Sequence, residues 1–186
     1  MVIQYLGEEC FRLQSGETAM LVNPTNNRLK ADVTLRTISA TGALPEAGEF
    51  IFAGEYETKG IEIRGWGIEE ESTDKFVKTV YAVEWEEMRL VFLGHLSKPL
   101  DSKLLEELGE PDILFVPTGD SHFLEPEQAA KLVKQLEPAI VIPSFRKDGK
   151  EFLKAMGEKG EAQEKLVLKK KDLADKKSQV VVLEVK

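Results

Sequence analysis

Short apolar stretches separated by turn residues fill the first hundred positions of the chain. In several of them apolar and polar residues alternate, which is typical of strands with one buried face. Gly7 and the Ser-Gly-Glu of 15–17 divide the first three, and this short spacing predicts an antiparallel meander. No strong helix is predicted before residue 100. The predicted strands are 2–6, 10–14, 18–23, 31–37, 49–54, 60–66, 78–85 and 89–94.

Helical periodicity begins after residue 100 and alternates with strands. One helix is predicted over 101–109, between a capping Asp101 and a terminating Gly109. A second is predicted over 125–138, where apolar residues share one face, and a third uses Phe152, Leu153 and Met156. A run of strands followed by strand–helix alternation predicts two sheets with helices outside, an α/β sandwich. Further strands are predicted at 112–117, 139–143, 165–170 and 179–185.

The stretch ADVTLRTISATGAL, residues 31–44, joins a predicted strand to a loop. Val33 and Leu35 lie on one face of the strand, and the loop begins at Ser39 and runs through Gly42. Loops that leave strands carry much of the chemistry of folded proteins. This loop holds no titratable and no strongly nucleophilic side chain, and the absence of such side chains at this position needs an explanation.

Length and charge restrict the class of protein. A chain of 186 residues fits a single domain over 1–186, with enough chain for a sizeable core. The net charge of −8 argues against nucleic acid and against anionic membrane surfaces as partners. A single cysteine excludes an internal disulfide, and the sequence predicts neither a leader nor a membrane-spanning segment. We therefore expect a cytoplasmic location.

Few residues could carry chemistry. His95 follows the strand 89–94, and His122 follows the buried strand 112–117 with Asp120 beside it. If the two loops converge, these three side chains would form a small polar cluster; otherwise Asp120 orders a turn and His122 is exposed. Cys10 lies within a predicted strand and is interpreted as a small buried hydrophobe rather than as a nucleophile.

Several stretches together resemble one family, the metallo-β-lactamase-fold hydrolases, in the branch of small bacterial zinc-dependent hydrolases. The resemblance runs from Ile3 to about Phe145 and is most specific in the second half. It implies an α/β fold, a four-layer αβ/βα sandwich of the metallo-β-lactamase type, shortened in the first half. The stretches that carry it are IQYLGEECFRLQSGETAMLVNP, ADVTLRT, AGEYETKGIEIRG, YAVEWEEMRLVFLGHLSKPLDSKLLEELGEPDILFVPTGD and LEPEQAAKLVKQLEPAIVIPSF.

The departures from this family concern its metal ligands. The resemblance implies a motif T-H-x-H-x-D-H after the strand 31–37, in which histidines and an aspartate hold two metal ions that activate water. Thr37 keeps its place. The remaining ligand positions are filled by Ile38, Ala40, Gly42, Ala43, His95 (where an aspartate is implied) and Phe145 (where a histidine is implied), and the histidine of the opening Leu-Gly-His falls on Glu8. The helix that follows the metal loop in the family is predicted to be missing or cut to a turn.

Three hypotheses about function follow. In the first, the protein has lost the dinuclear site, holds no cofactor, and acts by binding an unknown protein or small molecule, since structural and catalytic zinc needs three or four donors. In the second, it is a metal-dependent hydrolase with a relocated site around His95, Asp120 and His122, joined by Glu8 or Glu55. In the third, it is a structural subunit of a homo- or hetero-oligomer.

Overall fold

Two large β-sheets and three α-helices form most of the computed structural model, which describes residues 1–26, 28–119, 122–145 and 149–186. The smaller sheet has the strand order β14-β1-β2-β3-β4-β6, and the larger has β15-β12-β11-β10-β9-β8-β7, with β5 paired to β9. The smaller sheet consists of β14 (Leu166–Val167), β1 (Val2–Gly7), β2 (Cys10–Ser15), β3 (Thr18–Val22), β4 (Val33–Leu35) and β6 (Glu49–Phe50). The larger consists of β15 (Gln179–Val180), β12 (Ile140–Phe145), β11 (Ile113–Thr118), β10 (Met88–Phe92), β9 (Phe76–Trp85), β8 (Ile61–Gly67), β7 (Gly54–Thr58) and β5 (Ile38–Ala40).

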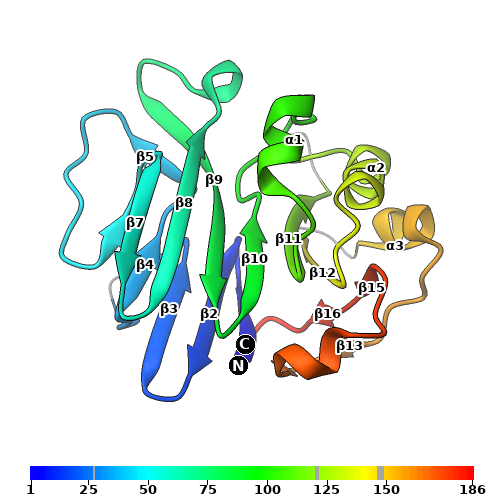
Figure 1. Ribbon diagram of the computed structural model, residues 1–186. Coiled ribbons are helices and arrows are strands. Elements are labelled where there is room, and N and C mark those ends of the chain that lie inside the picture. The colour runs from blue at the N-terminus through cyan, green and yellow to red at the C-terminus, as the bar shows by residue number, and fades with distance from the viewer. Residues whose placement is uncertain (27, 120–121, 146–148) are drawn as a thin grey trace.

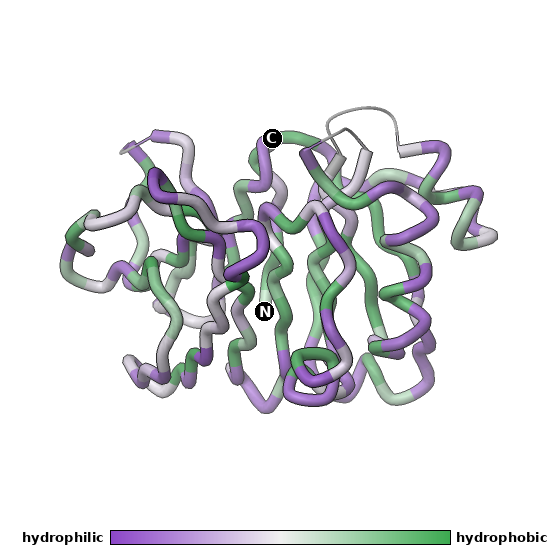
Figure 2. The backbone as a smooth tube through the Cα atoms, turned by 90° about the horizontal axis from the view of Figure 1, so that it is seen from above, coloured by the Kyte–Doolittle hydropathy of each residue, from purple (hydrophilic) through white to green (hydrophobic). Residues whose placement is uncertain are grey.

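The two sheets pack face to face around one apolar core (Figure 1). Phe11 of the smaller sheet meets Phe115 of the larger edge to face, with ring centroids 4.9 Å apart, and Phe115 stacks on Phe92 at 4.3 Å. Seen from above, hydrophobic residues run along the strands of this interior (Figure 2). The short strands β13 (Ala162–Gln163) and β16 (Val182–Leu183) form a separate pair.

A second apolar cluster joins the outer face of the larger sheet to the helices α1 (Ser102–Leu108), α2 (Pro126–Leu136) and α3 (Lys150–Met156). Pro126 occupies the first turn of α2, and the buried Ala129, Leu132 and Leu136 lie along its inner face. The side chain of Asp101 caps α1 by accepting from the backbone N–H of Leu104 at 2.8 Å. The predicted metallo-β-lactamase-type sandwich is confirmed, as are the three predicted helices.

The shortening predicted for the first half is also confirmed. Residues 41–48, where the resemblance implies a helix, form turns and irregular chain. Before α1, the described residues contain one short 3₁₀ turn, η1 (Glu69–Glu71), and no α-helix. The predicted meander is present as β1-β2-β3, and β4 then joins β3 in parallel.

A second 3₁₀ turn, η2 (Lys170–Leu173), follows β14 and contains part of a run of three lysines, residues 169–171. Lys170 forms an ion pair with Asp112 at 2.7 Å. Over the residues that the structure describes, no helix is both long and apolar enough to cross a membrane.

Candidate functional site

The loop 94–99, which follows β10 and carries His95, is the centre of the candidate site. Gly94 has φ +57°, and a Cβ added there would lie 2.1 Å from Cβ and Oγ1 of Thr37. Only glycine combines this left-handed backbone with such a close approach. The conformation of the loop is therefore set by packing against the residue that precedes β5.

Thr37 connects His95 to the end of β3. The Thr37 hydroxyl lies 2.8 Å from Nδ1 of His95, and the imidazole tautomer decides which of the two groups donates the hydrogen bond. Asn23 Oδ1 accepts from the backbone N–H of Thr37 at 2.8 Å, and Asn23 Nδ2 donates to the Thr37 hydroxyl at 2.9 Å. Thr37 is 1% and Asn23 8% exposed. Since Nδ1 is engaged in this buried network, proton exchange or metal binding at His95 would have to use Nε2.

Glu71 of η1 holds the other end of the same loop. Its carboxylate accepts from the backbone N–H groups of Ser97 and Lys98 at 2.9 and 2.8 Å, and from the Ser97 hydroxyl at 2.6 Å. Lys78 of β9 completes the set with an ion pair at 2.7 Å. Burial alone would raise the pKa of Glu71, but the hydrogen bonds from Lys78, Ser97 and Lys98 outweigh it and keep the pKa below its ordinary value. Sequence reasoning missed this residue.

Glu8 and Glu9 form the turn between β1 and β2, and their side chains have different environments. Glu8 is exposed, whereas Glu9 is only 3% exposed and accepts a hydrogen bond from the hydroxyl of Ser144 on β12. Both residues have positive φ, as a two-residue hairpin turn requires. Glu9 therefore joins the first hairpin to the end of β12. The sequence points to Glu8 and offers no signal that singles out Glu9.

The structure places the other predicted site residues as follows. His122 is exposed, and Asp120 lies outside the described residues. The ring of Phe123, next to His122, lies 5.9 Å from the His95 ring, so the two loops are neighbours. Glu55 is on β7 and forms an ion pair with Arg64 at 3.2 Å. Within the described ranges, no three or more His, Cys, Asp or Glu side chains form a group that could hold a metal ion.

The segment predicted to be an empty loop is partly a strand, and that part of the prediction is wrong. Residues Ile38–Ala40 form β5 and pair antiparallel with β9, with Ile38 opposite Lys78 and Ala40 opposite Phe76. The ladder is extended by the backbone bonds Thr79 N–H to Thr37 C=O and Thr41 N–H to Lys75 C=O, each 2.9 Å. Gly42 and Ala43 follow in the turn, and Phe145 ends β12.

Cys10 opens β2 and is 1% exposed. Burial raises the pKa of its thiol above the ordinary value, against smaller opposing effects of a Thr25 backbone hydrogen bond and of the Arg36 charge. The thiol is therefore protonated at neutral pH, which agrees with the predicted role as a small buried hydrophobe.

These features define a metallo-β-lactamase-type sandwich with its candidate site at the ends of β3, β10 and β12. Over residues 2–144 the chain matches the family model described as the β-lactamase superfamily domain. The protein belongs to this family.

Relatives and solved structures agree with this assignment. A metal-dependent hydrolase of Methanopyrus kandleri is 29% identical over 135 residues, 64% of this chain and 59% of the relative. One from Archaeoglobus fulgidus is 29% identical over 96 residues, 48% and 42% of the two chains. The chain thus spans about half the length of these curated relatives.

The fold is shared with solved structures of low identity. A Thermotoga maritima structure described as a Zn-dependent hydrolase of the metallo-β-lactamase superfamily has a TM-score of 0.80 and 24% identity, covering 100% of this chain and 99% of its own. A metallo hydrolase of Ignicoccus hospitalis has a TM-score of 0.68 and 16% identity, covering 98% and 94%. At this identity the likenesses show the fold alone.

Proposed function

We propose that this member of the β-lactamase superfamily has lost the dinuclear metal site and acts by binding rather than by metal-dependent hydrolysis. The observation that carries the proposal is that residues 38–40 form the strand β5, paired with β9. Its residues Ile38 and Ala40 occupy two of the ligand positions implied by the family resemblance, and they lie in a β-ladder rather than in an open loop.

The side chains at the implied ligand positions do not fit a dinuclear site. Ile38, Ala40 and Ala43 are aliphatic and Gly42 has no side chain, so none of them offers the N, O or S donor that zinc needs. His95 remains, but its Nδ1 is committed to Thr37. A single histidine nitrogen falls well short of the three or four donors of a zinc site.

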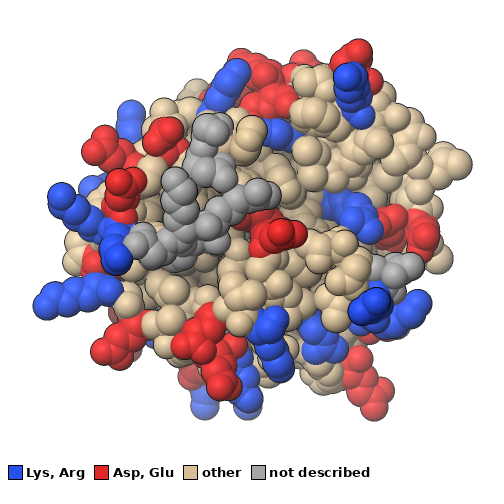
Figure 3. Space-filling model, turned by 180° about the vertical axis from the view of Figure 1, so that it is seen from behind, with Lys and Arg blue, Asp and Glu red and all other residues tan. Residues whose placement is uncertain are grey.

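The partner in this proposal is a protein or a small molecule, with no nucleic acid involved. The net charge of −8 repels phosphate backbones. On the face seen in Figure 3, the acidic and basic side chains of the described residues are interspersed, and these residues form no broad basic patch there. A subunit role in an oligomer belongs to the same proposal, because the family fold without its catalytic metals would then serve as a scaffold.

Metal content and activity test the proposal together. The protein is purified without a histidine tag from cells grown with added zinc, manganese and iron, and its metal is measured by mass spectrometry. We expect less than one-tenth equivalent of any metal, about the background of such measurements, and no phosphodiesterase, esterase or lactonase activity. His95→Ala and His122→Ala are both measured, because both histidines belong to the competing site described next.

The competing hypothesis is a hydrolase with a site relocated to His95, Asp120 and His122. The neighbouring rings of His95 and Phe123 favour it, because they bring the two loops together. Stoichiometric metal that is lost on His95→Ala, together with hydrolysis that depends on this metal, would establish the relocated site and overturn our proposal.

A further inference from the structure

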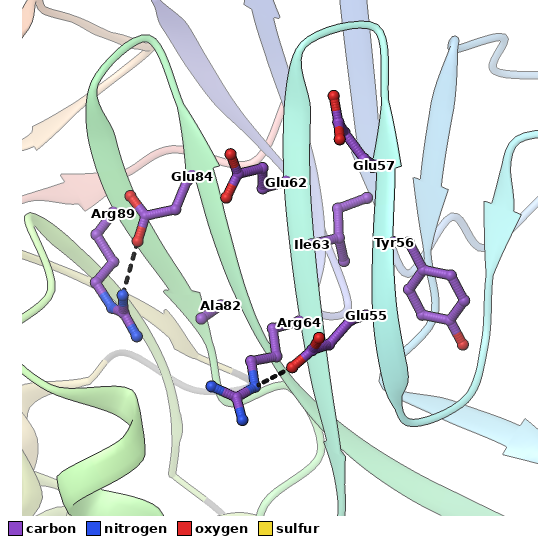
Figure 4. Close-up of a pocket in the computed structure, with 9 residues that line it drawn as sticks. All are labelled: Glu55, Tyr56, Glu57, Glu62, Ile63, Arg64, Ala82, Glu84 and Arg89. Atoms are coloured by element: carbon purple, nitrogen blue, oxygen red, sulfur yellow. Dashed lines mark hydrogen bonds and ion pairs between the residues drawn. The ribbon is translucent and has the colours of Figure 1, made fainter.

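Four strands of the larger sheet carry a row of charged side chains across the face turned away from the core. Direct cross-strand partners are Glu57 of β7 and Glu62 of β8, then Glu62 and Glu84 of β9, then Glu84 and Arg89 of β10. Figure 4 shows the three glutamates and Arg89 along these strands. Side chains at directly opposite positions of an antiparallel pair are neighbours, so three carboxylates lie in sequence.

Among the described residues, the cations of this face neutralise only one of the three carboxylates in the row, that of Glu84. Arg89 pairs with Glu84 at 2.7 Å, and Arg64 pairs with Glu55 and Glu107. Lys59, in the turn between β7 and β8, pairs with Asp32 at 2.6 Å. Among the described residues, no cation is paired with Glu57 or Glu62. Like charges directly opposite each other destabilise a sheet, so this pair costs stability in the isolated protein.

The row ends at an edge of the sheet. β7 is the last strand of the larger sheet, and its described backbone pairs only with β8. The next position in the row, beside Glu57, would belong to a further strand. An open groove of about 520 Å³ follows this face, lined by Glu55, Glu57, Glu62, Ala82 and the two arginines. On the opposite face of β7, Tyr56 packs against Phe50, with ring centroids 4.9 Å apart.

We propose that β7 accepts an extended segment of a partner protein, with lysine or arginine at alternate positions, as an added antiparallel strand. Edge-strand recognition draws affinity from backbone hydrogen bonds and specificity from alternate side chains. A cation beside Glu57 would continue the row with the opposite charge and relieve the Glu57–Glu62 repulsion. The intervening side chains of the segment would be apolar, since they follow the face of Tyr56.

This docking surface is defined by β7 with Glu57 and Glu62. It does not depend on whether the protein has kept or lost a metal site. The glutamates project from the outer face of the sheet, whereas the loop 94–99 and β5 lie at strand ends. Charged edge strands also serve to prevent unwanted pairing. That role would predict no affinity for any basic strand, which the following experiment measures.

The probe is a fluorescein-labelled octapeptide of alternating lysine and valine, titrated with the full chain and followed by anisotropy. We expect saturable binding that weakens by at least about tenfold in the double variant Glu57→Gln, Glu62→Gln, since tenfold corresponds to about 1.4 kcal/mol. The double variant Glu69→Gln, Glu70→Gln changes the net charge equally at two exposed positions and should bind as the parent does.

A second peptide separates strand addition from simple charge attraction. It carries proline in place of valine, keeps every lysine, and lacks the N–H groups of those positions. We expect it to bind at least about tenfold more weakly than the valine peptide. Amide exchange within Gly54–Thr58 should slow only with the valine peptide.

Three results would overturn the inference. The first is no saturable binding of the valine peptide. The second is equal binding of both peptides, or equal weakening by the two double variants. The third is a concentration-dependent dimer that is lost in Glu57→Gln, Glu62→Gln while the peptide fails to bind, because the occupant of the surface would then be the lysine segment 169–171 of a second copy.

Discussion

The single residues that fix the candidate site are buried polar groups, each with several partners. Thr37 holds His95 from one side, and Glu71 holds the backbone of Ser97 and Lys98 from the other. A loop tied at two points is a rigid element, because an opening motion must break several hydrogen bonds at once. The loop 94–99 is therefore held in one conformation from both sides.

We predict that Glu71→Gln destabilises the protein at neutral pH and alters its response to acid. The amide keeps one acceptor but loses the charge that pairs with Lys78, so the free energy of unfolding should fall by about 3 kcal/mol. The pKa of Glu71 is lowered in the folded state, below an unfolded value of about 4.3. Its contribution is therefore complete above that value and is lost as the pH falls through the folded pKa.

Urea unfolding between pH 3 and pH 7 measures this effect. The parent should lose stability towards pH 3 more steeply than Glu71→Gln, because the variant lacks the titrating carboxylate. Glu70→Gln changes an exposed neighbour and should follow the parent throughout. Parallel curves for parent and Glu71→Gln would show that the Glu71 carboxylate does not support the fold.

A second prediction concerns the contact between Gly94 and Thr37. Gly94→Ala places a methyl group 2.1 Å from Thr37 atoms on a backbone with φ +57°. We expect a loss of about 3 kcal/mol or more, from the strained backbone and the displaced core. Gly157→Ala is the control, with φ +75° in the ordinary left-handed region and nothing within 4 Å, and should cost only about 1 kcal/mol. Equal losses of unfolding free energy in the two variants, measured with urea, would mean that the Thr37 side chain moves aside without an energetic penalty.

At the scale of elements, some helices and strands can be predicted from the local sequence and others cannot. The helix α2 and the hairpin of β9 and β10 were predictable, because Pro126 and the apolar face of α2 are local signals and Glu86–Glu87 form a two-residue turn. The strand β5 was not predictable. It has three residues, and its stability depends on β9, which lies far away in the sequence.

The same limit applies to the site. The sequence singles out His95 by its position after a strand, but Glu9 and Glu71 become partners of Ser144 and Ser97 only through the tertiary fold. In the Glu8–Glu9 pair, the choice of the buried residue depends on hairpin geometry, which composition does not reveal.

We predict that β5 is a stabilising strand. Ser39 lies opposite Val77, and Ser39→Pro removes a backbone N–H from this ladder, which should cost about 3 kcal/mol. Amide exchange at Thr41 and Thr79, whose N–H groups bond across the ladder, should accelerate by at least about tenfold. Ser39→Ala is the control. Its buried Oγ has no hydrogen-bond partner among the described residues, so the alanine variant should be neutral or more stable by about 1 kcal/mol. Unchanged exchange in Ser39→Pro would contradict a structural role of β5.

At the scale of the whole molecule, the chain has the family fold, and the first part of the segment to which the resemblance assigns metal ligands is the strand β5 of the larger sheet. The core between the two sheets is built from strands of both, so the sandwich does not depend on a metal ion for its cohesion. A metal ion that bound the folded state would add to stability through its binding free energy. The two situations differ in a measurable way.

We therefore predict that the melting temperature of the tag-free protein is insensitive to metal. A site occupied at a ligand concentration of 100 Kd would add about 2.7 kcal/mol, which for a chain of this length shifts the melting temperature by about 5–10 °C. With zinc, manganese or a chelator added at millimolar concentration we expect shifts below about 1 °C. His95→Ala should melt in the same way with and without zinc, which separates a metal effect from its effect on packing against Thr37. A chelator-induced fall of several degrees, absent in His95→Ala, would show that this protein holds a metal at His95 after all.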